Sequence, residues 1–296
     1  MTLWIGLVVA AQLINALIVL IDKFLLTSKG GVQSPVAYAF YTAILPGSVL
    51  VLVPFGVIGI PSLTVFFFAT LSAALYVVAL IGLYTALKDI SATAAAPIIG
   101  VTTTVASAVL AFFFLAEDLQ DAFLPAVVLM AVGMFLVYCF CFSWKSFATV
   151  VVAGLLLGSS TFLLKIVFGL TDVWNALFWP LFMDAVVAVF VLLPLFYKHI
   201  RRNFKDTPNN MLGLAFGNKI LGGVVFALIY MGIALGSVSV VNALSGLQLV
   251  FRLMLAPLFA ARFPGEFSGE LLPGKVLLQV TGTILIVGGL AVLFVF

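Results

Sequence analysis

The sequence is poor in charged side chains, in cysteine and in histidine. Of its 296 residues, 8% are charged, and His199 is the single histidine. Because soluble domains carry about a quarter charged residues, this composition excludes a cytosolic enzyme, a disordered chain and a nucleic-acid-binding protein. Cys139 and Cys141 lie two positions apart on one apolar stretch, where a helix points their side chains in different directions, so no disulfide framework is expected.

The motifs of membrane enzymes and selective channels are also missing. The sequence has no HExxH-type metal pair, no nucleophile at a workable spacing from a base, and no glycine-rich phosphate loop with its lysine. No apolar segment carries the regularly spaced arginines of a voltage sensor, and no filter-like loop interrupts one. We therefore expect no catalytic residue, no metal site and no cofactor, and transport is favoured over catalysis and ion conduction.

Apolar residues dominate what is there, at 65% of the chain with a mean hydropathy of +1.36. A helix needs about 20 apolar residues to cross the hydrocarbon layer, and the alternating pattern of a membrane barrel is absent. The sequence therefore predicts an all-α integral membrane protein with ten transmembrane helices. The predicted spans are residues 2–26, 33–54, 64–86, 91–115, 123–142, 147–168, 173–197, 211–235, 238–260 and 276–296.

The two halves of the chain resemble each other when the sequence is compared with itself at an offset of 148 residues. Ala79–Ile81 then coincides with Ala227–Ile229, and Asp118 in one connection coincides with Glu266 in another. Each half holds five spans, an odd number, so the second half enters the membrane in the opposite orientation, as in many secondary transporters. We expect two inverted five-helix repeats, residues 1–143 and 144–296.

The basic residues between the spans predict the orientation of the chain. All of them fall in the connections after spans one, three, five, seven and nine: Lys29, Lys88, Lys145, Lys198, Arg201, Arg202, Lys205, Arg262 and Lys275. Basic connections stay in the cytoplasm. The pattern therefore predicts a multi-pass protein of the cell membrane with both termini external.

Six charged residues lie inside the predicted spans, where a charge costs at least ~2.5–3.5 kcal/mol on insertion scales. They are Asp22, Lys23, Lys165, Asp184, Lys219 and Arg252. Lys23, Lys165 and Lys219 are close enough to span ends to extend to the surface, whereas Arg252 is too deep. Asp184, near mid-depth, is interpreted either as the partner of Arg252 or Lys219 or as a group that couples transport to protons.

Polar residues form stripes on three spans. At about 100° per residue, one face of span nine holds Asn242, Ser245, Gln248 and Arg252, and one face of span one holds Gln12, Asn15, Asp22 and Lys23. The stripe on span eight consists of Lys219, Gly223, Phe226 and Tyr230. Such stripes must face one another or water. For Gln12, Ser245 and Thr102–Thr104, simple interhelical hydrogen bonding is an equally good explanation.

The segments ISATAAAPIIGVTTTVASAVLAFFFLAEDL and VSVVNALSGLQLVFRLMLAPLFA, within two five-span halves, resemble the EamA-like transporters of the drug/metabolite transporter superfamily. The most specific likeness is in span four, where small residues and Pro97 precede an apolar stretch that closes in Ala116-Glu117, similar to the Gly-Glu usual in that family. The second half departs from the pattern, with Ser245 in place of the proline and Gly265-Glu266 displaced towards the C-terminus.

The resemblance implies a central cavity lined by spans one, three, four, six, eight and nine, and export of small metabolites such as amino acids. It also implies cytoplasmic termini, opposite to the orientation that the basic residues predict, and we keep the orientation from the charges.

We therefore expect a secondary transporter that exports a small carboxylated solute by alternating access. The candidate substrate-binding residues are Asn15, Tyr84, Lys219, Tyr230, Asn242, Gln248 and Arg252, with Asp184 as the coupling candidate. The expected partners are a small-molecule substrate and membrane lipid, with a homo-oligomer left open. The alternative is a non-transporting scaffold or lipid-handling protein, in which the polar stripes only hold helices together.

Overall fold

The computed structural model describes residues 3–115, 122–138, 143–235, 244, 246–267 and 276–295. All regular elements in these ranges are helical, which confirms the predicted all-α class. They are α1 (Leu3–Thr27), α2 (Pro35–Ile44), η1 (Leu45–Phe55), α3 (Leu63–Asp89), α4 (Ala92–Leu115), α5 (Phe123–Tyr138), α6 (Trp144–Leu170), α7 (Val173–Val187), η2 (Ala188–Leu192), α8 (Leu193–Asp206), α9 (Asn209–Leu235), α11 (Leu247–Arg262), α12 (Pro264–Phe267) and α13 (Val276–Val295). Six helical segments of this described part are long and apolar enough to cross a membrane.

Polar side chains fix where several of these helices begin. The hydroxyls of Ser34, Ser62 and Ser143 accept hydrogen bonds from backbone N–H groups three residues later, at the starts of α2, α3 and α6. Asp172 caps α7 by accepting from the N–H groups of Trp174 and Asn175. The Asn175 side-chain amide also donates to this exposed carboxylate, which lowers the pKa of Asp172. Such caps satisfy N–H groups that the helix itself leaves unbonded.

Proline changes the path of the second and seventh predicted spans. The second divides at Ile44 into α2 and the 3-10 helix η1, because Pro46 has no N–H to continue an α-helix. Pro194 likewise leaves a carbonyl unbonded, and the chain passes through the π-helical turn η2 and a non-helical residue, Phe196. The helix then continues to Asp206 as α8. The prediction that the seventh span ends at residue 197 in a basic loop is therefore wrong.

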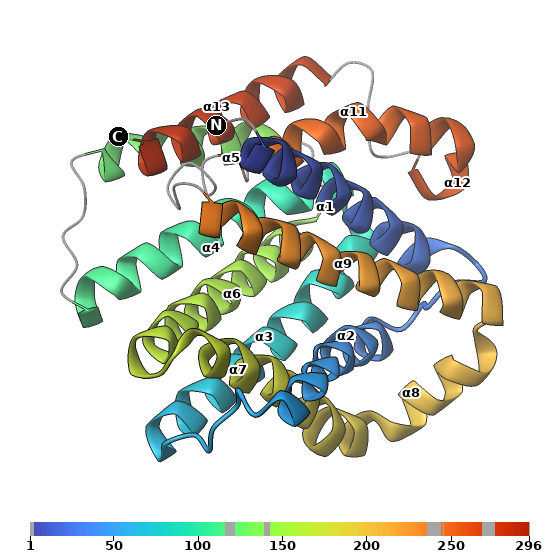
Figure 1. The fold of residues 1–296 in the computed structure, drawn as a ribbon. Coiled ribbons are helices and arrows are strands. Elements are labelled where there is room, and N and C mark those ends of the chain that lie inside the picture. Colours follow the sequence, from blue (N-terminus) through green and yellow to red (C-terminus); the bar gives the residue numbers. More distant parts are fainter. Residues whose placement is uncertain are drawn as a thin grey trace.

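The helices pack in pairs that join the two halves of the chain. α1 packs against α9 and α11, whereas α6 packs against α3 and α4. α5 packs along α13, and η1 contacts α7. Figure 1 shows α9 running beside α1, and α6 beside α3. Most long-range packing therefore connects elements from opposite halves, and α1 and α6 each lie between two helices of the other half.

Small residues allow the closest of these contacts. A Cβ atom on Gly158 of α6 would lie 2.6 Å from the Ala106 Cβ and 2.6 Å from the Thr103 carbonyl oxygen of α4. A Cβ on Gly133 of α5 would lie 2.5 Å from the Gly282 oxygen of α13. Without a hydrophobic driving force between helices in lipid, such close backbone approach supplies much of the packing energy.

We predict that Gly158→Leu destabilises the protein by about 1–3 kcal/mol, because the added side chain overpacks the contact between α4 and α6. The matched control is Gly217→Leu in α9, where a Cβ meets no other atom within 4 Å and the residue is exposed. Thermal unfolding of the purified protein in detergent measures the difference. Equal melting temperatures for the two variants would contradict the proposed close packing of α4 against α6.

Candidate functional site

A buried ion pair between Lys219 of α9 and Asp22 of α1 is the centre of the polar site. The Lys219 Nζ lies 2.7 Å from the Asp22 Oδ1, and both side chains are 8% exposed. The same carboxylate oxygen accepts hydrogen bonds from the Tyr38 hydroxyl of α2 at 2.5 Å and from the Asn218 Nδ2 at 2.6 Å. Asn218 also donates to the Ile18 carbonyl at 3.1 Å. One carboxylate therefore ties three helices together.

A fourth helix, α3, reaches the same cluster through Tyr84. The Lys219 ammonium donates to the Tyr84 hydroxyl at 3.1 Å, and that hydroxyl lies 3.0 Å from the Thr42 Oγ1 of α2. The ammonium also lies 4.3 Å from the centre of the Tyr38 ring, within the range of a cation–π interaction. We call Asp22, Tyr38, Thr42, Tyr84, Asn218 and Lys219 the ion-pair cluster.

In α1 the ion-pair cluster lies towards the C-terminal end, and in α9 it lies between the first turn and the middle of the helix. Asp22 is five residues, or about 7.5 Å, before the end of α1, and Lys219 is about 15 Å from the start of α9. Both of these helix ends lead into segments that carry basic residues.

A second polar contact lies deeper, at the middle of α1. Asn15 is the thirteenth of the 25 residues of α1, and its Nδ2 donates to the Gln248 Oε1 of α11 at 3.0 Å. Arg252, one turn further along α11, is 2% exposed. We call Asn15, Gln248 and Arg252 the mid-depth group. Three predicted site residues from two predicted stripes thus lie on α1 and on its neighbour α11.

Two lysines do not extend to the membrane surface. Lys23 is buried, and its Nζ donates to the carbonyl oxygens of Leu87 at 2.5 Å and Ile90 at 2.7 Å, at the C-terminal end of α3. Such carbonyls have no partner within their own helix. Lys219 is held by Asp22. The prediction of a surface position is wrong for both, and only Lys165 has an exposed side chain.

Asp184 of α7 is buried at 8% exposure, as its place in the middle of a span predicted. Of the three interpretations of Asp184, pairing with Lys219 is wrong, because Lys219 pairs with Asp22. Pairing with Arg252 and proton coupling stay predictions. α7, which carries Asp184, packs against α3 and η1.

The remaining predicted residues have different outcomes. Asn242, Ser245 and the side chain of Tyr230 lie outside what the structure describes. Thr102 and Thr104 donate to carbonyls of their own helix, and Thr103 donates to the Gly154 carbonyl of α6 at 3.2 Å. Interhelical hydrogen bonding, one of the two interpretations left open, is therefore seen for Thr103.

Three members of the ion-pair cluster were missed in the sequence. Tyr38 and Thr42 lie one turn apart on a short, mostly apolar helix that has no charged residue. Asn218 is next to Lys219, whose charge is the stronger signal in the sequence. A usable signal was present in the adjacent pair Asn218-Lys219. Two neighbouring polar residues within an apolar span need a polar group on an opposing helix.

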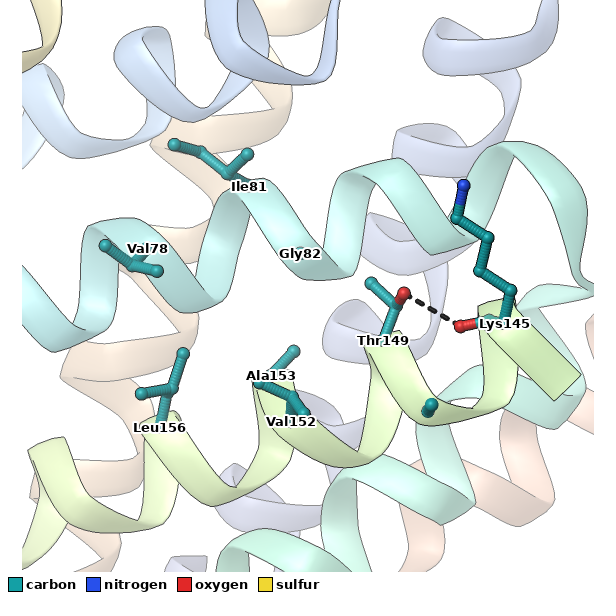
Figure 2. A pocket seen from close by; sticks show the side chains of 9 residues that line it. Val78, Ile81, Gly82, Lys145, Thr149, Val152, Ala153 and Leu156 are labelled. Carbon is teal, nitrogen blue, oxygen red and sulfur yellow. Dashed lines mark hydrogen bonds between the residues drawn. The ribbon is translucent and has the colours of Figure 1, made fainter.

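The structure also has an apolar groove between α3 and α6, with a volume of about 490 Å³ (Figure 2). Its walls include Val78, Val152 and Leu156, and the hydroxyl of Thr149 is already bonded to the Lys145 carbonyl. Val78 and Val152 are about half exposed on the outside of the helix pair. A polar solute would find few hydrogen-bonding partners here, so this groove suits lipid chains rather than a transported metabolite.

Comparisons with known proteins give information on the fold of the chain and none on its function. No family model matches the chain, and no curated protein matches it. The chain is similar to a solved structure described only as the crystal structure of a protein, with 18% sequence identity, a TM-score of 0.54, and coverage of 97% of this chain and 98% of the other. This likeness extends over the whole length and establishes a shared fold without an activity.

Proposed function

We propose that the protein is a secondary transporter that moves a small carboxylated solute across the cell membrane by alternating access, in the direction of export. The observation that carries the proposal is the buried Lys219–Asp22 ion pair, shared among α1, α2, α3 and α9. Ionisable groups inside a membrane bundle are costly, and they are typical of substrate and ion pathways.

The pairing of helices supports two inverted repeats. If residues 144–296 repeat residues 1–143, α1 corresponds to α6, α3 to α9, α4 to α11 and α5 to α13. The α3–α6 contact in one half-to-half arrangement then has the α9–α1 contact as its counterpart. In the same way, the α4–α6 contact has the α11–α1 contact as its counterpart. The contact of α5 with α13 maps onto itself. Such exchange is expected for two halves related by a two-fold axis in the membrane plane.

The two polar layers of α1 have separate roles in this mechanism. The mid-depth group is the solute-binding layer, because transporter sites lie near the bilayer midplane. The ion-pair cluster is a gate that closes the path from this layer to the surface where α1 and α3 end. Movement of α1 against α9 breaks the Lys219–Asp22 contact and opens that path, and re-forming the contact closes it.

The chemistry of Arg252 favours a carboxylated solute. A guanidinium group stays protonated and binds a carboxylate through two parallel hydrogen bonds. Asn15 and Gln248 offer amide donors and acceptors that orient the rest of the solute. Asp184, which is buried in α7, remains our candidate for coupling transport to protons.

The basic residues support an orientation with the gate on the cytoplasmic side. Lys29, Lys88 and Arg202 come from three different connections or helix ends and line one pocket, so these segments share one membrane surface. Basic segments stay in the cytoplasm. With ten spans, both termini would then be external.

We predict that Arg252→Gln lowers uptake of the carboxylated substrate at least tenfold in proteoliposomes, because a charged hydrogen-bonded contact of about 1.5–3 kcal/mol is lost. Radiolabelled amino acids and short carboxylic acids are screened first with the wild-type protein. The matched control is Lys165→Gln, which removes an exposed basic side chain. Wild-type uptake by Arg252→Gln, with equal reconstitution, would contradict the role of Arg252.

We also predict that the mid-depth layer is reached by water. In a background of Cys139→Ser and Cys141→Ser, a cysteine at Gln248 reacts with a water-soluble thiol reagent, whereas one at Ile286 does not, because Ile286 is fully buried in the contact between α5 and α13. Added substrate slows the reaction at position 248. If neither cysteine reacts in membranes, the polar contacts are dry packing and a scaffold or lipid-handling protein becomes the better interpretation.

A further inference from the structure

A polar pocket of about 380 Å³ lies at one end of the bundle, between the loop after α1, the C-terminal end of α3, and α8. Its lining includes Lys29, Lys88, His199 and Arg202, together with one carboxylate, Asp206. Arg202 and Asp206 form an exposed ion pair at 3.3 Å. The lining thus holds three permanent cations against one anion, and a ligand suited to it carries negative charge.

The loop that forms one wall is fixed before any ligand binds. The side-chain amide of Gln33 donates to the carbonyls of Ser28 and Lys29, and Lys88 donates to the Gln33 carbonyl at 3.1 Å. A Cβ on Gly31 would collide with the Leu25 carbonyl, so the tight turn requires glycine. The positions of the backbone around Lys29 and Lys88 are therefore set by the fold.

The second wall, α8, places the pocket at the depth of lipid headgroups. The helix combines four basic residues with exposed apolar side chains at Leu195, Tyr197 and Phe204. A basic amphipathic helix of this kind lies in the membrane interface. Figure 1 shows α8 at the margin of the bundle, after the bend at Phe196. The phosphate groups of membrane lipids are expected at this same level.

We propose that this pocket binds the phosphate group of an anionic phospholipid. Lysine binds phosphate as a point charge, and arginine binds it through two parallel hydrogen bonds. Positively charged groups near a membrane surface each contribute to the attraction of anionic lipid, and the pocket collects three of them around one cavity. Occupation of the pocket would join α1, α3 and α8 through the bound phosphate.

The test measures binding of phosphatidylglycerol to the full-length protein in detergent, with phosphatidylcholine as the neutral lipid, by native mass spectrometry. The variant Lys29→Ala/Lys88→Ala/Arg202→Ala is expected to lower the affinity for phosphatidylglycerol about 100-fold. The matched control, Lys198→Ala/Arg201→Ala/Lys205→Ala, removes the same charge from exposed positions of α8 that do not line the pocket. We expect less than a threefold change for this control.

Equal losses in the two triple variants would overturn the proposal, because binding would then follow surface charge rather than the pocket. Lack of preference for phosphatidylglycerol over phosphatidylcholine would overturn the proposed lipid ligand. Inorganic phosphate is then tested with the wild type and with the pocket variant, and binding to the wild type alone is the one result that leaves a phosphate site. That last result would keep the phosphate site and assign it a soluble ligand. A monodisperse elution profile for each variant establishes that it is folded.

Discussion

The Lys219–Asp22 ion pair is the interaction on which the arrangement of the bundle most depends. Two charges removed from water require a close partner and further hydrogen bonds to offset the loss of hydration. Here the ammonium has a carboxylate, a phenol and an aromatic ring, and the carboxylate oxygen has three donors. These partners come from four helices, so satisfying one pair of charges sets the relative positions of α1, α2, α3 and α9.

Hydropathy alone predicted the all-helical class of the protein and the presence of long apolar helices. The described residues are helical in all their regular elements, and six of the helical segments are long and apolar enough to cross a membrane. Only a helix satisfies its own backbone groups in lipid. The failure at residues 198–206 has a clear cause. A search for uninterrupted apolar runs ends at the first basic cluster, whereas an amphipathic helix continues through it with its charges on one side.

The sequence predicts which helices carry the candidate site better than it predicts which residues contact one another. The stripes on α1 and α11 met through Asn15 and Gln248, as two polar stripes in one bundle must. Helical periodicity gives the face of a residue but not which helix that face meets. For that reason Lys219 had no predictable partner, and Asp22 and Lys23, neighbours in sequence, turned out to serve two different helices. Tyr38 entered the cluster from a helix with no other strong polar signal.

In the transport cycle that we propose, the two polar layers of α1 have different roles. A gate made of charges can open reversibly, since each charged group finds water when the contact breaks, whereas a gate of interlocked apolar side chains has no comparable alternative state. The close glycine contacts of α5 with α13 and of α4 with α6 join helices outside this region. The close glycine contacts and the polar contacts of α1 therefore lie at different places in the same fold.

The most direct test of the central claim is a double-mutant cycle on the two charges, with the free energy of unfolding of Asp22→Asn, Lys219→Gln and the double variant measured in detergent. If the ion pair sets the positions of α1 and α9, each single variant loses about 3–5 kcal/mol because one buried charge is left uncompensated, and the double variant is more stable than either. Simple addition of the two single losses would contradict this account.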